Sequence, residues 1–428
     1  MAGRFAATTQ WAAQLVTRLP AGVRVPVAML AAALDRDTPP AAISPLDSQS
    51  PSSMLRIEDR PSTSLKGYRP AAFAATLERL WALPKIELHL HLEGSLRPQT
   101  VCELAAGYEP ESPLCRAGWE ASYWTFRDLA GFVAEFGRVL RTCLRRPEDY
   151  YRVARECFED LAAQHVIYAE VSFGPRIPGR PYYVPLAETA AAIDQARREV
   201  EAKSALQAGI IVGIARDRVA EHEAGAEALA LRYVREALQA RERGVAISGI
   251  DLHGNEQALA AVEPFVPAFR LAEEAGLGLR AHAGEASGAP TVWDSLRQLR
   301  AQRIAHGVRA IEDPALVAHL ARAGIALDLC PTSNVYTGAV PSLAAHPIRM
   351  LHDAGVPVTV SSDDPLVFGT SVTAELAILE QMLDFSQAEI GAMQMAAAAQ
   401  SFLPAEQRVA LAGRLHAAWS APARPIAR

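Results

Sequence analysis

The sequence predicts an α/β fold of the TIM type: a (β/α)₈ barrel with extra helices over its C-terminal face and at its C-terminus. Three observations predict it. From Ala71 onward, short apolar runs alternate with longer helical stretches, which is typical of a parallel α/β fold. Eight such runs with seven helical connections favour a closed barrel over an open sheet. No glycine-rich phosphate turn follows the first run, as an open nucleotide-binding sheet would have.

The predicted strands are near-continuous apolar runs, as expected of strands covered on both faces. They span residues 85–92, 166–173, 209–215, 246–252, 278–282, 303–306, 326–330 and 356–361. Helices are predicted between them, among them 187–205, 224–243, 262–275 and 314–323, and terminal helices at 375–383 and 387–402. Residues 97–160 are too many for one crossover helix, so they are expected to add helices over the barrel mouth.

Residues 1–66 differ from the rest of the chain. They are rich in proline and serine and have little periodicity, which predicts a disordered extension. The alternative is a non-native leader from an over-long gene prediction, with Met54 as the true start. An apolar run at 25–34 behind Arg18 and Arg24 is similar to a secretory signal, but a disordered extension or a non-native leader is favoured. Residues 67–428 are then the barrel domain.

The composition points to a small-molecule partner. The chain has 428 residues, 50% of them hydrophobic, and a net charge of −6. Because no basic run is present, nucleic acid is not expected as a partner, and no stretch approaches the ~20 apolar residues of a membrane span. Five cysteines without CxxC spacing predict reduced thiols and a cytoplasmic protein. A homo-oligomer is compatible with these features.

Several predicted strands end in ionisable residues, and in a barrel these ends form the active-site face. His89 and His91 are separated by one residue on the first strand, so both side chains face the barrel axis. Neutral imidazole is a good zinc ligand. For this pair alone, a buried histidine satisfied by hydrogen bonds is an equally good explanation.

The other strand ends make a metal site the better hypothesis. The fifth strand ends at His282 with Glu285 following, the sixth ends at His306, and Asp363 and Asp364 follow the eighth. A helix N-cap explains one aspartate, but two adjacent carboxylates inside a site call for a cation. Three histidines and one aspartate would leave one zinc position open for water, whose pKa the metal lowers. His306 would then orient or deprotonate that water, and Glu285 would hold a proton for the substrate.

Six motifs in series resemble the adenosine deaminase family of metal-dependent amidohydrolases. In chain order they are Pro84-Lys85-Ile86-Glu87-Leu88-His89-Leu90-His91-Leu92-Glu93-Gly94, Gly249-Ile250-Asp251-Leu252-His253-Gly254-Asn255-Glu256, His282-Ala283-Gly284-Glu285, Arg303-Ile304-Ala305-His306-Gly307, Cys330-Pro331-Thr332-Ser333-Asn334 and Ser362-Asp363-Asp364-Pro365. The resemblance covers the chain from about Leu83 to its end. Each motif is weak alone, and the series is specific.

The resemblance implies a reaction and a set of roles. One Zn²⁺ per subunit would be held by four ligands: His89, His91, His282 and Asp363. Glu285 looks like the acid that protonates purine N1, while His306 and Asp364 look like the pair that positions the water, with Asp364 also near the base. Gly254 resembles the glycine whose amide meets purine N3, and Glu93 stands next to the ribose 5′ end. The reaction would be hydrolytic deamination at C6 of a 6-aminopurine.

Departures from the family pattern concern the substrate. Adenosine deaminases usually have aspartate in place of Glu93, and adenine deaminases usually carry a different sequence after the second strand. Arg176 and Arg180 follow that strand here, either as solvated loop charges or as partners of a substrate carboxylate. The favoured substrate is a nucleoside, adenosine or a 5′-extended one such as aminodeoxyfutalosine of menaquinone biosynthesis. The alternative is free adenine.

Three other classes fit less well. Binuclear lactonases and dihydroorotases usually place a bridging lysine at the end of the fourth strand, where this chain has Asp251-Leu252-His253-Gly254. Cytidine-type deaminases need a Pro-Cys-x-x-Cys ligand pair, and Cys330-Pro331 has no second cysteine nearby. A catalytically dead scaffold would have lost a ligand or the acid, and none is lost.

Overall fold

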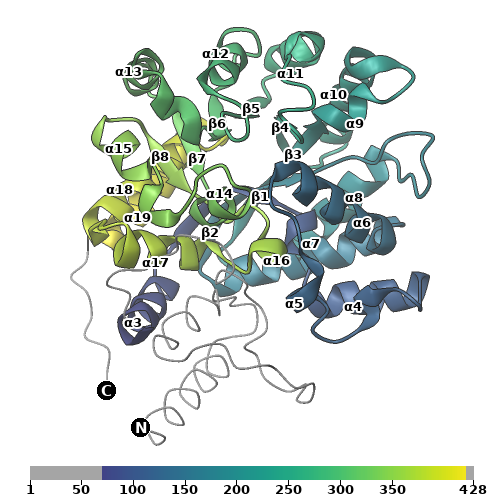
Figure 1. Cartoon of the computed structure of the whole chain (residues 1–428), viewed down its shortest axis with the longest axis horizontal. Helices are drawn as coiled ribbons and strands as arrows, with labels where there is room; N and C mark the ends of the chain where they lie inside the picture. The colour runs from purple at the N-terminus through teal and green to yellow at the C-terminus, as the bar shows by residue number, and fades with distance from the viewer. Residues whose placement is uncertain (1–69, 421–428) are drawn as a thin grey trace, which may run out of the picture.

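Eight parallel strands follow one another around one sheet in sequence order in the computed structural model, which describes residues 70–420 (Figure 1). They are β1 (Lys85–His91), β2 (Val166–Phe173), β3 (Gln207–Ala215), β4 (Ile247–His253), β5 (Gly278–Ala283), β6 (Arg303–His306), β7 (Ala326–Leu329) and β8 (Val358–Val360). The last strand meets the first through a parallel bridge between Leu90 and Asp363. The predicted barrel is confirmed.

Helices surround the strands and add two further groups. Those between consecutive strands from β2 onward are α8 (Leu186–Glu201), α9 (Arg216–Ala220), α10 (Gly225–Glu242), α11 (Val266–Glu274), α12 (Ala289–Arg297), α13 (Pro314–Ala323), α14 (Pro331–Tyr336) and α15 (Ile348–Asp353). Between β1 and β2 lie α4 (Pro98–Tyr108), α5 (Glu120–Tyr123), α6 (Leu129–Cys143) and α7 (Pro147–Ala163). The remaining helices are α3 (Pro70–Trp81), α16 (Pro365–Phe368), α17 (Val372–Met382), α18 (Gln387–Gln400) and α19 (Ala405–Trp419).

The predicted elements agree with this arrangement except at their ends. β8 is shorter than predicted because it is ladder-paired only at 358–360, whereas β3 begins two residues earlier, at Gln207. The segment predicted as one helix at 262–275 is a 3₁₀ turn (Glu263–Phe265) followed by α11. The predicted leader at 1–66 lies outside the described residues. No helix within 70–420 is long and apolar enough to cross a membrane.

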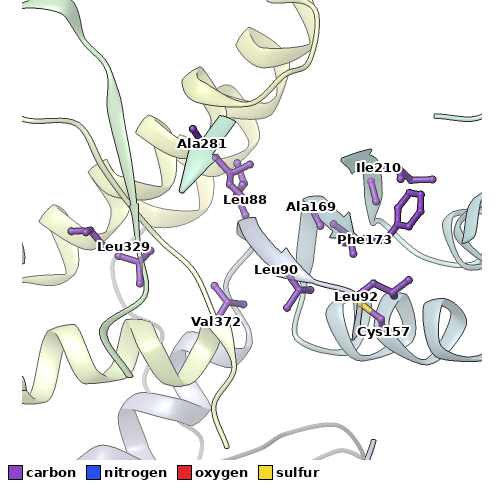
Figure 2. Packing of buried hydrophobic residues seen from close by; sticks show 14 of the residues in the cluster. Leu88, Leu90, Leu92, Cys157, Ala169, Phe173, Ile210, Ala281, Leu329 and Val372 are labelled. Carbon is purple, nitrogen blue, oxygen red and sulfur yellow. The ribbon is translucent and has the colours of Figure 1, made fainter. Parts of the chain in front are cut away.

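The first strand shows how the sequence separates core from site. Leu88 and Leu90 belong to the hydrophobic cluster between the strands and the helices (Figure 2), whereas His89 and His91 alternate with them and face the barrel axis. All seven residues of β1 are buried. The strand therefore packs with one face and presents its imidazoles with the other.

The barrel interior below the histidines is charged and internally paired. Arg303 forms ion pairs with Glu170 and with Asp328, whose carboxylate lies 2.6 Å from the guanidinium. Arg280 pairs with Asp251 at 3.0 Å. These five side chains are fully buried, so removing one partner would leave an uncompensated charge in the core. The network fixes the strands that carry the site.

Candidate active site

The residues at the strand ends adopt backbone conformations that side chains rarely take. His306 and Asp363 have φ of 61° and 62°, the left-handed region usually left to glycine. Two backbone hydrogen bonds hold Asp363 in place: its N–H donates to the carbonyl of His89, and its carbonyl accepts from His91, both at 3.0 Å. Such local strain persists where the surrounding structure enforces it, and it is concentrated at functional sites.

The four predicted metal ligands converge on one point. Nε2 of His282 lies 3.1 Å from Nε2 of His89 and 3.3 Å from Nε2 of His91. Oδ1 of Asp363 lies 3.4 Å from Nε2 of each of the two β1 histidines. Donors at about 2.0–2.1 Å from a tetrahedral ion are separated from one another by about 3.3–3.4 Å. The spacing therefore fits one metal ion bound by these four side chains, with water as a fifth ligand.

The hydrogen bonds behind two of these imidazoles also call for a cation. Nδ1 of His89 lies 3.4 Å from the carbonyl oxygen of Asp328, and Nδ1 of His282 lies 3.1 Å from a carboxylate oxygen of Asp251. Because these oxygens can only accept, each Nδ1 carries the proton, and each Nε2 presents a lone pair. Two lone pairs facing each other at 3.1 Å repel unless a positive ion lies between them.

A second set of residues supports the ligands, and sequence reasoning assigned them no role. Asp251 orients His282 and is itself held by Arg280; although burial opposes its ionisation, Arg280 and His282 hold the pKa of Asp251 well below its usual range. Ser333 donates to Oδ2 of Asp363 at 2.6 Å, which leaves Oδ1 for the metal. Both residues lie in motifs quoted above. Because metal-binding histidines usually donate their second ring N–H to a carboxylate, the motif that contains Asp251 could have indicated this role.

Three further predicted residues surround this centre. Nε2 of His306 lies 3.5 Å from Glu285 and 3.9 Å from Asp363. Burial, together with the carboxylates of Asp363 and Glu256, raises the pKa of Glu285 well above its usual range. Burial and the Asp363 carboxylate likewise raise the pKa of Asp364, whose Oδ1 has no hydrogen-bond partner among the described residues.

Both His91 and His306 lie close to the other three candidate ligands. A ring nitrogen of His306 lies within 4.8 Å of donor atoms on His89, His282 and Asp363. The shorter distances favour His91 as the fourth ligand, because its Nε2 is 3.3–3.4 Å from two of the other donors, whereas His306 is 3.9 Å from Asp363. His306 then lies beside the metal position rather than at it.

The turn that carries Glu285 is held by another carboxylate. Glu256 accepts hydrogen bonds from the backbone N–H groups of Gly284, Glu285, Ala286 and Ser287, at 2.8–3.2 Å. Four charge-assisted hydrogen bonds to one buried carboxylate make a rigid turn. Glu256 is not among the residues that line the cavity described below, so it acts as a scaffold for Glu285 rather than as a group that meets substrate.

A cavity opens from this centre and contains most of the predicted substrate residues. Glu93, Gly254, Arg176 and Asp364 all line it, together with His91, His282, Glu285, His306 and Asp363. Arg180 is exposed and is not among the lining residues. One wall comes from α6 through Leu129, Phe132, Val133, Phe136 and Leu140, so the segment predicted to lie over the mouth does so. Which of its side chains face the cavity was not predictable, because no motif marks them.

Two arginines at the cavity have different surroundings. Arg176 donates from Nη2 to the carbonyls of Leu140 and Leu144 at 2.6 Å and from Nε to the hydroxyl of Tyr150 at 3.1 Å. It thus caps the end of α6. The guanidinium of Arg218, which sequence reasoning missed, has no hydrogen bond or ion pair within residues 70–420.

A parallel barrel with imidazoles and a carboxylate converging at its strand ends defines the class of the amidohydrolases. The adenosine deaminase family model matches residues 84–418, and the chain belongs to that family. It is a hydrolase that acts on carbon–nitrogen bonds.

Two curated relatives are equally similar to the chain. The aminodeoxyfutalosine deaminase of Streptomyces avermitilis is 38% identical over 361 residues, which is 83% of this chain and 98% of the relative. The adenine deaminase of Rhizobium leguminosarum bv. trifolii is 38% identical over 339 residues, covering 78% and 99%. A crystal structure of an amidohydrolase from Burkholderia ambifaria with bound zinc superposes with a TM-score of 0.72 at 27% identity, covering 83% of this chain and 93% of that one.

Proposed function

We propose that this protein is a zinc-dependent deaminase that hydrolyses the C6–amino bond of a 6-aminopurine nucleoside and releases ammonia. The observation that carries the metal is the arrangement of His89, His91, His282 and Asp363, whose donor spacing fits one ion with water as a fifth ligand. Zinc bound there would polarise a water molecule and lower its pKa, which makes a nucleophile available at neutral pH. The family and its deaminase relatives support a purine substrate.

The protein side chains supply the proton transfers and the orientation. Water oxygen bonds to C6, the proton taken from that water passes to N6, and the C6–N6 bond breaks with release of ammonia. The second O–H proton returns to Glu285, which gave its own to N1, so C6 becomes a carbonyl carbon. Glu285, buried and with a raised pKa, is the proposed donor of a proton to N1. His306 orients the attacking oxygen, and Asp364 receives its proton and faces the base. Gly254, with φ of 96°, brings its backbone against the purine.

Beyond the base, the cavity supports a substrate with an anionic extension. Arg218 lines it and forms no ion pair within the described range. Burial, together with Arg218 and Arg176, lowers the pKa of Arg141, so three guanidiniums lie near one another, and Glu93 is the carboxylate that interacts with Arg176 and Arg218. Guanidinium binds carboxylate well, and such an arrangement favours an anionic ligand. We therefore infer a 5′-extended nucleoside with a carboxylate, such as aminodeoxyfutalosine, with Arg218 as its partner and Arg176 as a support.

Free adenine is the second candidate, because an adenine deaminase is as similar to this chain as the nucleoside-type relative. A substrate panel separates them: adenine, adenosine, aminodeoxyfutalosine and its methyl ester, compared by kcat/KM for ammonia release. We expect the acid to be the best substrate. Arg218→Ala should lower its kcat/KM about 10- to 100-fold and leave the ester unchanged, since a charge-assisted hydrogen bond contributes about 1.5–3 kcal/mol. The exposed Arg243→Ala is the matched control. Preference for adenine would overturn the nucleoside assignment.

A further inference from the structure

A chain of buried hydrogen bonds leads from the protein backbone to His306. The backbone N–H of Ile348 donates to Nδ1 of His346 at 3.1 Å. Nε2 of His346 lies 3.1 Å from Oδ1 of Asn334, and Nδ2 of Asn334 lies 3.0 Å from Nδ1 of His306. The exposed fractions of the three side chains are 6%, 0% and 1%. No water is needed to complete the series, and none of its members is a metal ligand.

The direction of every hydrogen bond in this chain follows from its first member. A backbone N–H can only donate, so Nδ1 of His346 accepts. Burial lowers the pKa of His346 to about 3, so the ring is neutral and its single proton is on Nε2. That N–H donates to the oxygen of Asn334, and the amide nitrogen therefore faces His306. This assignment of donors and acceptors does not depend on how the oxygen and nitrogen of the Asn334 amide were placed, because the backbone N–H of Ile348 determines it.

We propose that Asn334 and His346 are positioning residues that fix His306 as the tautomer with its proton on Nε2. Nδ1 of His306 must accept from the Asn334 amide, so the proton of the neutral ring is on the other nitrogen. That nitrogen is the one that faces the reaction centre, 3.5 Å from Glu285 and 3.9 Å from Asp363. The inference rests on the proposed function only for what this N–H does during turnover.

Two consequences follow for the site. A protonated Nε2 cannot coordinate a metal, so His306 is excluded as a ligand and His91 takes the fourth corner. The same N–H donates a hydrogen bond towards the attacking oxygen and cannot remove a proton from it. His306 thereby contributes orientation and charge stabilisation rather than base catalysis.

Nitrogen NMR on the zinc-loaded protein with ring-¹⁵N histidine tests the tautomer directly, without substrate. His306 signals are assigned by their loss in His306→Gln. We expect a protonated Nε2 and an unprotonated Nδ1 in the wild type. Asn334→Asp replaces the amide donor by an acceptor, which requires a proton on Nδ1 and should exchange the two signals. His346→Gln retains both hydrogen bonds, because its oxygen can accept from Ile348 and its nitrogen can donate to Asn334, so its signals should match the wild type.

Steady-state kinetics gives the second measurement. Asn334→Asp should lower kcat about 10²-fold, the usual effect of losing one oriented donor, with KM and zinc content nearly unchanged. His346→Gln should stay within about threefold of the wild type. A protonated Nδ1 in the wild type, or loss of the Nε2 proton in His346→Gln, would overturn the proposal even if Asn334→Asp did not fold. If His306 carries its proton on Nε2 but no purine is deaminated, the positioning role of Asn334 and His346 is supported and the proposed function is wrong.

Discussion

Gly94 packs directly against Asp364. A Cβ atom added at Gly94 would lie 2.6 Å from the Cα of Asp364 and 2.7 Å from its Cβ, closer than non-bonded carbon atoms approach. Because the obstructing atoms belong to the backbone and the root of the side chain, no rotamer change relieves the clash. Gly94 is therefore the residue that allows the Asp364 carboxylate to enter the cavity beside the metal site.

Gly94→Ala is expected to displace Asp364 and to impair catalysis more than stability. Overpacking of this kind costs about 1–3 kcal/mol, and we expect kcat/KM to fall at least about tenfold. Urea unfolding and ammonia release measure the two effects. Gly107→Ala in α4 is the matched control, because nothing lies within 4 Å of its added Cβ. The free energy of unfolding of the control should rise by roughly 0.5–1 kcal/mol, and its activity should not change. Unchanged kcat/KM in Gly94→Ala would refute this role.

Glu285→Gln should retain the metal and lose most of the rate. Glutamine keeps the shape of the side chain but cannot supply an acidic proton, and general acid catalysis contributes about 10²- to 10⁴-fold. Metal analysis should give the wild-type content, while kcat falls by that factor. Glu242→Gln at the exposed end of α10 controls for charge removal. A variant with near-normal turnover would show that another group protonates the purine.

Asp251→Asn should weaken metal binding without removing a ligand. The carboxylate accepts from Nδ1 of His282 at 3.1 Å and raises the basicity of that ring. Loss of such a partner typically lowers metal affinity about 10- to 100-fold. Competition with a coloured chelator measures the dissociation constant. Asp384→Asn, at an exposed position outside every cluster of candidate ligands within residues 70–420, should bind metal like the wild type. Equal metal affinities in both variants would show that Asp251 does not support metal binding.

His346 should make the protein sensitive to mild acid. Burial lowers the pKa of His346 to about 3, whereas an unfolded histidine titrates near 6.5. Above pH 6.5 both states are neutral, so this histidine adds no pH dependence. Between pH 6.5 and 3 only the unfolded state binds the proton, so stability falls by about 1.4 kcal/mol per pH unit. His346→Gln removes this contribution, so the free energy of unfolding of the variant should rise relative to that of the wild type as pH falls. A difference independent of pH would contradict the shift.

The sequence predicted the barrel and the convergence of four candidate ligands because both depend on local patterns. Alternation on one strand places His89 and His91 on the same face, and parallel strands bring their carboxyl ends together, so His282 and Asp363 join them. The structure adds the distances between their donor atoms. These relations need no knowledge of side-chain packing.

Other features depend on contacts between segments far apart in the sequence. Arg176 and Arg218 carry the same charge, but only the first is capped by the carbonyls of Leu140 and Leu144. The chain of hydrogen bonds from His346 through Asn334 to His306 depends on the conformation of a loop, which the sequence motifs do not predict. Periodicity predicts which face of an element is buried, but it does not predict the partner that a polar atom finds there.

Titration of metal-free protein with zinc, followed by ammonia release from a 6-aminopurine nucleoside, tests the central claim most directly. If His89, His91, His282 and Asp363 form one site, activity should rise linearly and reach its plateau at one equivalent of zinc per chain. The Asp363→Ala variant should reach no comparable plateau at the same zinc concentrations. Full turnover by the metal-free protein, or a plateau at two equivalents, would contradict a single catalytic zinc.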